Sequence, residues 1–237
     1  MAQAQSVYAA TLDTVQAEAK AVDRHWLRGV RREAYAAFLL ASHTLTERAQ
    51  SYTVVRVTAE NPSSLSQLSA ELRIAETSLR GTYLITALEG GAEVEAISFR
   101  VMRATLAFGK LHERGAALDQ AWANLVDLSE SSGEAAVRQH ASSLITSLAG
   151  LAVAVLDHYP NRAVRLPTPD MPASVAEAAR SCPTDFRNLQ DLVSEEDRRL
   201  LLEIQYRGVV RARSEYENTR LELDTAREEF TTALRGA

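Results

Sequence analysis

The last fifth of the chain repeats every seven residues. One column of the repeat is apolar and the neighbouring column is largely arginine. The apolar column consists of Leu202, Val209, Tyr216, Leu223 and Phe230, and the other of Arg199, Tyr206, Arg213, Arg220 and Arg227. A period of seven keeps one face of a helix against a partner through a left-handed supercoil. The pattern therefore predicts long, paired helices.

The rest of the chain contains few residues that break helices. Among 237 residues there are ten glycines and six prolines, and 46% of the residues are hydrophobic. Long stretches without breakers favour helices over sheets. We therefore predict an all-α protein, an elongated helical bundle with long, coiled-coil-like helices at the N- and C-terminal ends. It is predicted to form one elongated domain.

The N-terminal helix is expected to begin near Ser6. Its apolar positions advance in alternating steps of four and three (Tyr8, Leu12, Val15, Ala19, Val22 and Trp26). Steps of four then carry the face through Val30 and Ala34 to Phe38, so the apolar face turns around the helix. Pro62 is expected to end this element after about residue 58.

The pattern divides the chain into four segments. Residues 1–60 form the long N-terminal helix, and 61–159 a bundle core with helices over 64–88, 92–114, 116–129 and 134–159. Glycines at 90, 91 and 115 are predicted to separate three of these helices. Residues 160–192 form a proline-containing linker with a short helix over 173–180 that breaks at Pro183. Residues 193–237 form one long C-terminal helix that Ser194 caps.

The location of the protein is predicted from its apolar stretches and its single cysteine. The most apolar stretch, 144–156, is too short to cross a bilayer, so we expect a buried central helix. The first residues lack the pattern of a secretory signal. Cys182 is alone and cannot form an intramolecular disulfide. These features predict a cytoplasmic protein.

One segment resembles a known group of proteins. Residues 25–39 read HWLRGVRREAYAAFL, and 88–94 read LEGGAEV. The first half of the chain thus resembles uncharacterised all-helical proteins of actinobacteria that carry an Arg-Arg-Glu-Ala-Tyr-Ala-x-Phe-Leu segment. Gly91 stands where that group commonly has proline. The resemblance implies a cytoplasmic, all-helical protein and no particular activity.

The sequence offers no catalytic or cofactor-binding pattern. No histidine follows an acid by three residues, as a di-metal bundle requires. Phosphate-binding and dinucleotide-binding glycine loops and the His-Glu-x-x-His zinc motif are also missing. We therefore expect no enzymatic activity, no cofactor and no metal, although a pocket in the bundle for a small ligand stays open.

Two groups of arginines are candidate interaction residues. Arg24, Arg28, Arg31 and Arg32 form a basic stripe on the first helix, which could bind phosphates or pair with acids such as Glu195, Glu196 and Asp197. We favour the pairing, because the net charge is −5. Arg213, Arg220 and Arg227 form a solvated flank or a part of the seam that fixes register. The sequence leaves that choice open.

The function expected from this pattern is that of a non-enzymatic interaction or scaffold protein. Its exposed helix faces would dock a protein partner, or a second copy in a homodimer. The alternative is a regulator that contacts nucleic acid or anionic membrane through the basic stripe. No small-molecule substrate is indicated.

Overall fold

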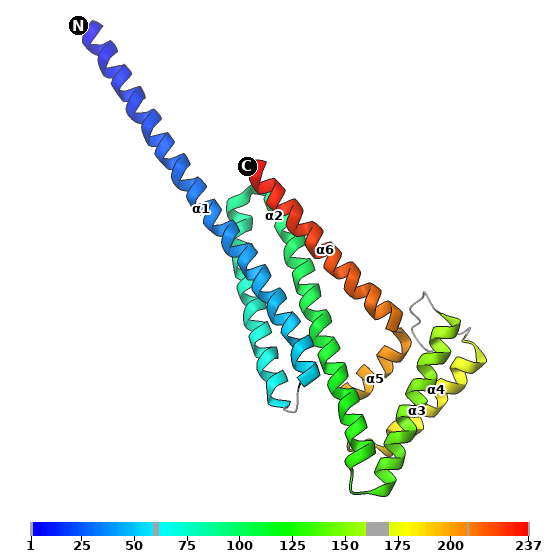
Figure 1. The fold of residues 1–237 in the computed structure, drawn as a ribbon. Coiled ribbons are helices and arrows are strands. Elements are labelled where there is room, and N and C mark those ends of the chain that lie inside the picture. The colour runs from blue at the N-terminus through cyan, green and yellow to red at the C-terminus, as the bar shows by residue number, and fades with distance from the viewer. Residues whose placement is uncertain (1, 59–61, 160–170, 208, 237) are drawn as a thin grey trace.

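A computed structural model describes the backbone of residues 2–58, 62–159, 171–207 and 209–236. Within these ranges, the side chains of residues 2–17, 19, 23–24, 52–58, 62–65, 181, 203–207, 209–214 and 236 lie outside the described part. All regular elements in the described part are helices, as the sequence predicts (Figure 1). They are α1 (Ala2–Thr58), α2 (Pro62–Ser131), α3 (Ala135–His158), α4 (Ala173–Asn188), α5 (Glu195–Arg207) and α6 (Val209–Gly236).

The element α2 reverses direction at Gly91, so its two halves run side by side (Figure 1). Gly91 has a φ of 69° and a ψ of 177°. Glycine adopts a positive φ without the steric cost that a Cβ atom imposes. At Gly90 a Cβ atom would overlap the side chain of Val94. The predicted break at the two glycines is therefore present.

The break predicted at Gly115 is wrong, because α2 continues through it to Ser131. A glycine inside a helix costs only about 1 kcal/mol relative to alanine, which tertiary packing offsets. Here the neighbouring Ala116 is buried in the core.

The first hydrophobic cluster joins α1, α6 and both halves of α2. Its largest buried side chains include Phe38, Leu45, Leu79, Phe108 and Phe230. The rings of Phe38 and Phe230 lie 5.4 Å apart in an edge-on arrangement, which is favourable for aromatic pairs. The end helices of the chain are thus packed in the same cluster.

The second hydrophobic cluster joins the end of α2 with α3, α4 and α5. It includes Leu125, Leu148, Leu151, Phe186 and Leu201. Together the two clusters give the molecule its elongated shape, with α2 passing from one to the other (Figure 1).

The helix break predicted at Pro183 is also wrong, since α4 continues to Asn188 with Pro183 inside it. Proline removes one backbone hydrogen bond from a helix. The turn that follows is held by packing and polar contacts. Phe186 is buried, and the carboxylate of Asp185 accepts hydrogen bonds from Ser143 and Ser147 at 3.0 and 2.8 Å.

The single helix predicted over 193–237 is two helices, α5 and α6. Ser194 does cap the first of them, since its hydroxyl accepts a hydrogen bond from the backbone N–H of Asp197 at 3.0 Å. The helix α5 packs in the second cluster and α6 in the first, so the seven-residue column serves two cores.

The apolar stretch 144–156 is part of α3, and α3 is long and apolar enough to cross a membrane by length and composition alone. The prediction that this stretch is too short considered only part of the helix. One face of α3 is buried, through Leu144, Leu148, Leu151 and Val155. Only 28% of its most apolar window is buried, so α3 covers one side of the second cluster and is not a central helix.

Candidate functional site

The N-terminal part of α1 projects beyond the bundle (Figure 1). We call its residues 18–33 the arm. Two large apolar side chains of the arm are largely exposed, Val22 at 67% and Trp26 at 66%, and Leu27 is exposed at 39%. Val22 and Trp26 lie one helical turn apart and therefore share a face. The apolar positions before residue 18 lie outside the described side chains.

The basic stripe lies on the same arm. Arg28, Arg31 and Arg32 are exposed, and the side chain of Arg24 lies outside the described part. The ion pairs recorded between described residues do not include these three arginines. The acids expected to pair with the stripe, Glu195 and its neighbours, lie on α5, which packs against α2 and α3. Among the described side chains, Arg28, Arg31 and Arg32 form no ion pair with them. Glu195 instead pairs with Arg198 at 3.3 Å.

The arginine column of α6 has two different environments. Arg220 is exposed, and its Nε lies 3.8 Å from a carboxylate oxygen of Asp224, four residues on. Arg227 points inward and is half-buried. Burial lowers the pKa of Arg227, whereas the charge of Asp224 raises it. Arg213 lies outside the described side chains. Thus one arginine is a solvated flank and the next contacts a neighbouring helix.

Arg227 connects three helices through a chain of hydrogen bonds. Its Nη2 donates to the carbonyl oxygen of Ser42 at 2.9 Å and to Thr46 Oγ1 at 2.7 Å, and its Nε donates to Ser42 Oγ at 3.1 Å. The Ser42 hydroxyl lies 2.8 Å from Thr105 Oγ1, which donates its own proton to the carbonyl of Val101. Ser42 is therefore the donor to Thr105. This network fixes the register of α6 against α1 and α2.

The apolar column predicted as a seam is divided between the two clusters. Leu223 and Phe230 are buried in the first cluster, and Tyr216 packs against it. Leu202 packs against the second cluster, and the side chain of Val209 lies outside the described part. The column therefore packs within one chain over the described residues, against different neighbours at its two ends.

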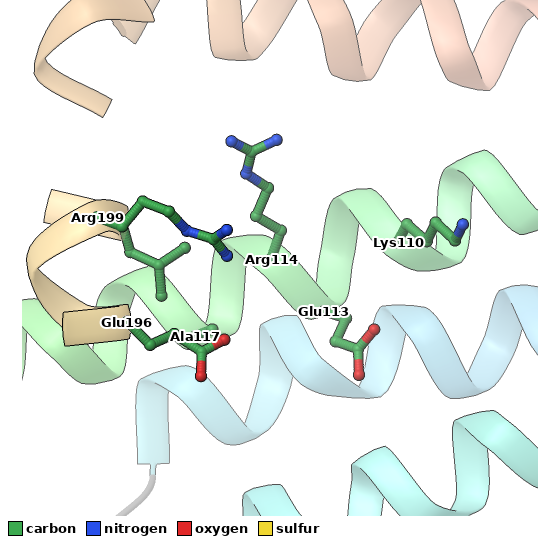
Figure 2. Close-up of a pocket in the computed structure, with 7 residues that line it drawn as sticks. Lys110, Glu113, Arg114, Ala117, Glu196 and Arg199 are labelled. Atoms are coloured by element: carbon green, nitrogen blue, oxygen red, sulfur yellow. The ribbon is translucent and has the colours of Figure 1, made fainter. Parts of the chain in front are cut away.

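A polar cleft lies between α2 and α5, and we call it the α2–α5 cleft. Its volume is about 500 Å³. Its lining consists of Lys110, Glu113, Arg114, Ala117, Glu196, Arg199 and Leu200. Arg114 and Arg199 lie near each other on one side, and Lys110 lies farther along α2 and points away from them (Figure 2). The carboxylates of Glu113 and Glu196 lie on the opposite side. A second hollow of about 340 Å³ adjoins it and shares both glutamates.

Sequence patterns did not indicate this cleft. Lys110 and Arg114 lie far from Arg199 along the chain, and only the packing of α5 on α2 brings them together. A weak signal exists in hindsight. Lys110 is one of only two lysines in the sequence, and it shares a helix face with Arg114 at a spacing of four.

The other groups considered for chemistry are the single cysteine and the side chains that could bind a metal ion. Cys182 is buried, and burial, together with Asp185, raises its pKa to about 11. A thiol with this pKa is protonated at neutral pH and is a poor nucleophile. No group of three or more histidine, cysteine, aspartate or glutamate side chains among the described residues could hold a metal ion.

Comparison with known proteins completes the description of these sites. The chain matches no protein-family model, no curated protein and no solved structure. The resemblance to actinobacterial helical proteins therefore stays a prediction.

Proposed function

We propose that this chain is a non-enzymatic interaction or scaffold protein that docks a protein partner through the arm of α1. The observation that carries the proposal is the exposure of Val22 and Trp26 on one face of a helix that extends past its own bundle. A helix of this kind is marginal in water unless its apolar face packs against something. Large exposed apolar side chains that cluster on a surface are typical of interaction sites.

The partner that best fits the arm is a second copy of the same arm in antiparallel orientation. The alternating steps of four and three from Tyr8 to Trp26 are those of a coiled-coil seam. One antiparallel register places Trp26 opposite Val15 and Val22 opposite Ala19, so that a large side chain meets a smaller one in each layer. The same register places Glu18 beside His25 on the flank. Both copies make these contacts, as two-fold symmetry requires.

The test is the oligomeric state of the full chain, measured by light scattering. We expect a homodimer in the unmodified protein and a monomer after Trp26→Glu. Leu88→Glu is the matched control, because Leu88 is 85% exposed but lies outside the arm. A monomer at about 100 μM unmodified protein, with no protein that co-purifies with it, would contradict the proposal.

A second candidate function is supported by the exposed arginines of the arm. Arg28, Arg31 and Arg32 are the kind of residues that bind phosphates of nucleic acid or anionic lipid. We place this function second, because a net charge of −5 opposes general attraction to polyanions. Its test is salt-dependent binding to duplex DNA and to vesicles that contain phosphatidylserine.

The double variant Arg31→Gln, Arg32→Gln distinguishes the two functions. Loss of two phosphate contacts on duplex DNA should flatten the salt dependence by about two units of slope. Dimer formation depends on the apolar face and should survive this change. The second function would be excluded if the unmodified protein bound neither duplex DNA nor these vesicles.

The location that accords with this role is the cytoplasm, which we propose on two grounds. Cys182 is a free, buried thiol, as is common in a reducing compartment. The partner that we propose is the chain itself, which needs no other compartment.

A further inference from the structure

We propose that the α2–α5 cleft binds a small molecule that carries one phosphate group and several hydroxyl groups, the chemistry of a sugar phosphate. This site is separate from the arm of α1 and does not depend on the function proposed for the arm. It lies where the two hydrophobic clusters meet along α2.

The basic side of the cleft supplies the phosphate contacts. Lys110 and Arg114 lie one turn apart on α2. Arg199 reaches across from α5, and its guanidinium points toward α2 (Figure 2). A bound phosphate dianion would form charge-assisted hydrogen bonds with these side chains.

Two of these cations have no recorded ion pair within the described part of the chain. Glu113 is three residues from Lys110 and Glu196 is three residues from Arg199, a spacing that permits ion pairs on a helix. The ion pairs between described residues include neither Lys110 nor Arg199. Within the described side chains, Lys110 and Arg199 can therefore turn to a ligand.

The acidic side of the cleft selects against a polyanion. The carboxylate of Glu113 is held by a hydrogen bond of 3.0 Å from Ser69, and Glu196 lies beside it. Carboxylates accept hydrogen bonds from hydroxyl groups but repel a second phosphate. The adjoining hollow adds further polar residues, Gln120, Ser194 and Asp197, beside the apolar Ala116 and Leu200.

The size and polarity of the cleft agree with such a ligand. Small-molecule sites in proteins span about 300–1,000 Å³, and the cleft holds about 500 Å³. Most sites of that class are lined by apolar groups, whereas only Ala117 and Leu200 are apolar here. A ligand with several polar groups therefore suits these residues.

The test is isothermal titration calorimetry of the full chain with glucose 6-phosphate, inorganic phosphate and pyrophosphate as probes. We expect glucose 6-phosphate to bind most tightly and pyrophosphate least. Arg199→Gln and Lys110→Gln should each weaken binding of glucose 6-phosphate by about 10-fold to 100-fold, the effect of losing one charge-assisted hydrogen bond. Arg73→Gln, an exposed change elsewhere on α2, should leave the affinity unchanged.

A further variant tests the acidic side. Glu196→Gln should raise the affinity for pyrophosphate relative to glucose 6-phosphate, because one repelling charge is lost. Two results would overturn the proposal: no binding of any probe at about 1 mM, or an equal effect of Arg199→Gln and Arg73→Gln. Tighter binding of pyrophosphate than of glucose 6-phosphate by the unmodified protein would overturn it as well.

Discussion

The two halves of α1 belong to one helix but lie in different surroundings. In the second half Phe38 and Leu45 are completely buried, whereas in the first half Val22 and Trp26 are about two-thirds exposed. Both halves carry apolar side chains at helical spacing. The periodicity therefore indicates which face of a helix is apolar but not what covers that face, which depends on segments far away in the sequence.

The largest loss of stability is expected from a substitution in the second, buried half of α1. Phe38→Ala should lower the free energy of unfolding by about 3–5 kcal/mol, because the ring is fully buried and a cavity would remain. Its partners Phe230 and Tyr83 come from other helices and cannot easily fill the space. Urea unfolding of the purified chain measures this loss. A loss below about 1 kcal/mol would mean that the first cluster is loosely packed.

A second prediction extends the comparison to two leucines of α6. Leu223→Ala should cost about 2–4 kcal/mol, since Leu223 is buried in the first cluster. Leu221→Ala should change the free energy of unfolding by less than about 0.5 kcal/mol, because that side chain is exposed. Equal losses in urea unfolding would refute the placement of the apolar column against α1 and α2.

Local sequence patterns predicted one part of the fold and missed another. The helical class, the break at Gly90 and Gly91 and the cap at Ser194 follow from local pattern, and the structure contains them. The start of α1 does not agree, because the helix begins at Ala2 and not near Ser6. The breaks expected at Gly115 and Pro183 did not appear. Both residues lower the stability of an isolated helix, and packing of the neighbouring Ala116 and Phe186 outweighs that cost.

The candidate sites were harder to predict, because each depends on contacts between distant residues. Arg227 stands in the predicted arginine column, but its partner Ser42 is 185 positions away. Nothing in the spacing distinguished it from the exposed Arg220. The α2–α5 cleft likewise depends on the packing of α5 against a part of α2 that is far away in the sequence.

A third prediction compares these two arginines. Arg227→Met should lower the free energy of unfolding by about 1–2 kcal/mol, because hydrogen bonds to a charged donor are lost while its desolvation cost is also removed. Ser42 and Thr46 keep other partners, which limits the loss. Arg220→Met should cost less than about 0.5 kcal/mol, since its ion pair is exposed. Indistinguishable losses in urea unfolding would argue against the network.

A fourth prediction concerns the pH dependence of the first cluster. His112 packs against Phe108 and Tyr216, and burial lowers its pKa below 6.5. The unfolded chain then binds more protons than the folded chain, so this residue reduces stability as the pH falls through 6.5. The melting temperature should drop by a small amount between pH 7.5 and 5.5, and His112→Gln should reduce that drop. An equal drop in melting temperature in the unmodified protein and in His112→Gln would contradict this assignment.

The smallest effect on stability is expected in the uncovered half of α1. Trp26→Ala should change the free energy of unfolding of the monomer by less than about 0.5 kcal/mol, because the side chain is exposed and contributes little to the bundle. The same residue should nevertheless report pairing of the arm. In a Trp122→Phe background Trp26 is the only tryptophan, so its fluorescence comes from the arm alone. At low protein concentration its emission should be that of an exposed indole, and it should shift to shorter wavelength as the concentration rises and a second copy covers the ring. Emission that stays constant over a hundredfold range of concentration, together with a loss in Trp26→Ala close to that of Phe38→Ala, would show that the bundle itself covers the arm.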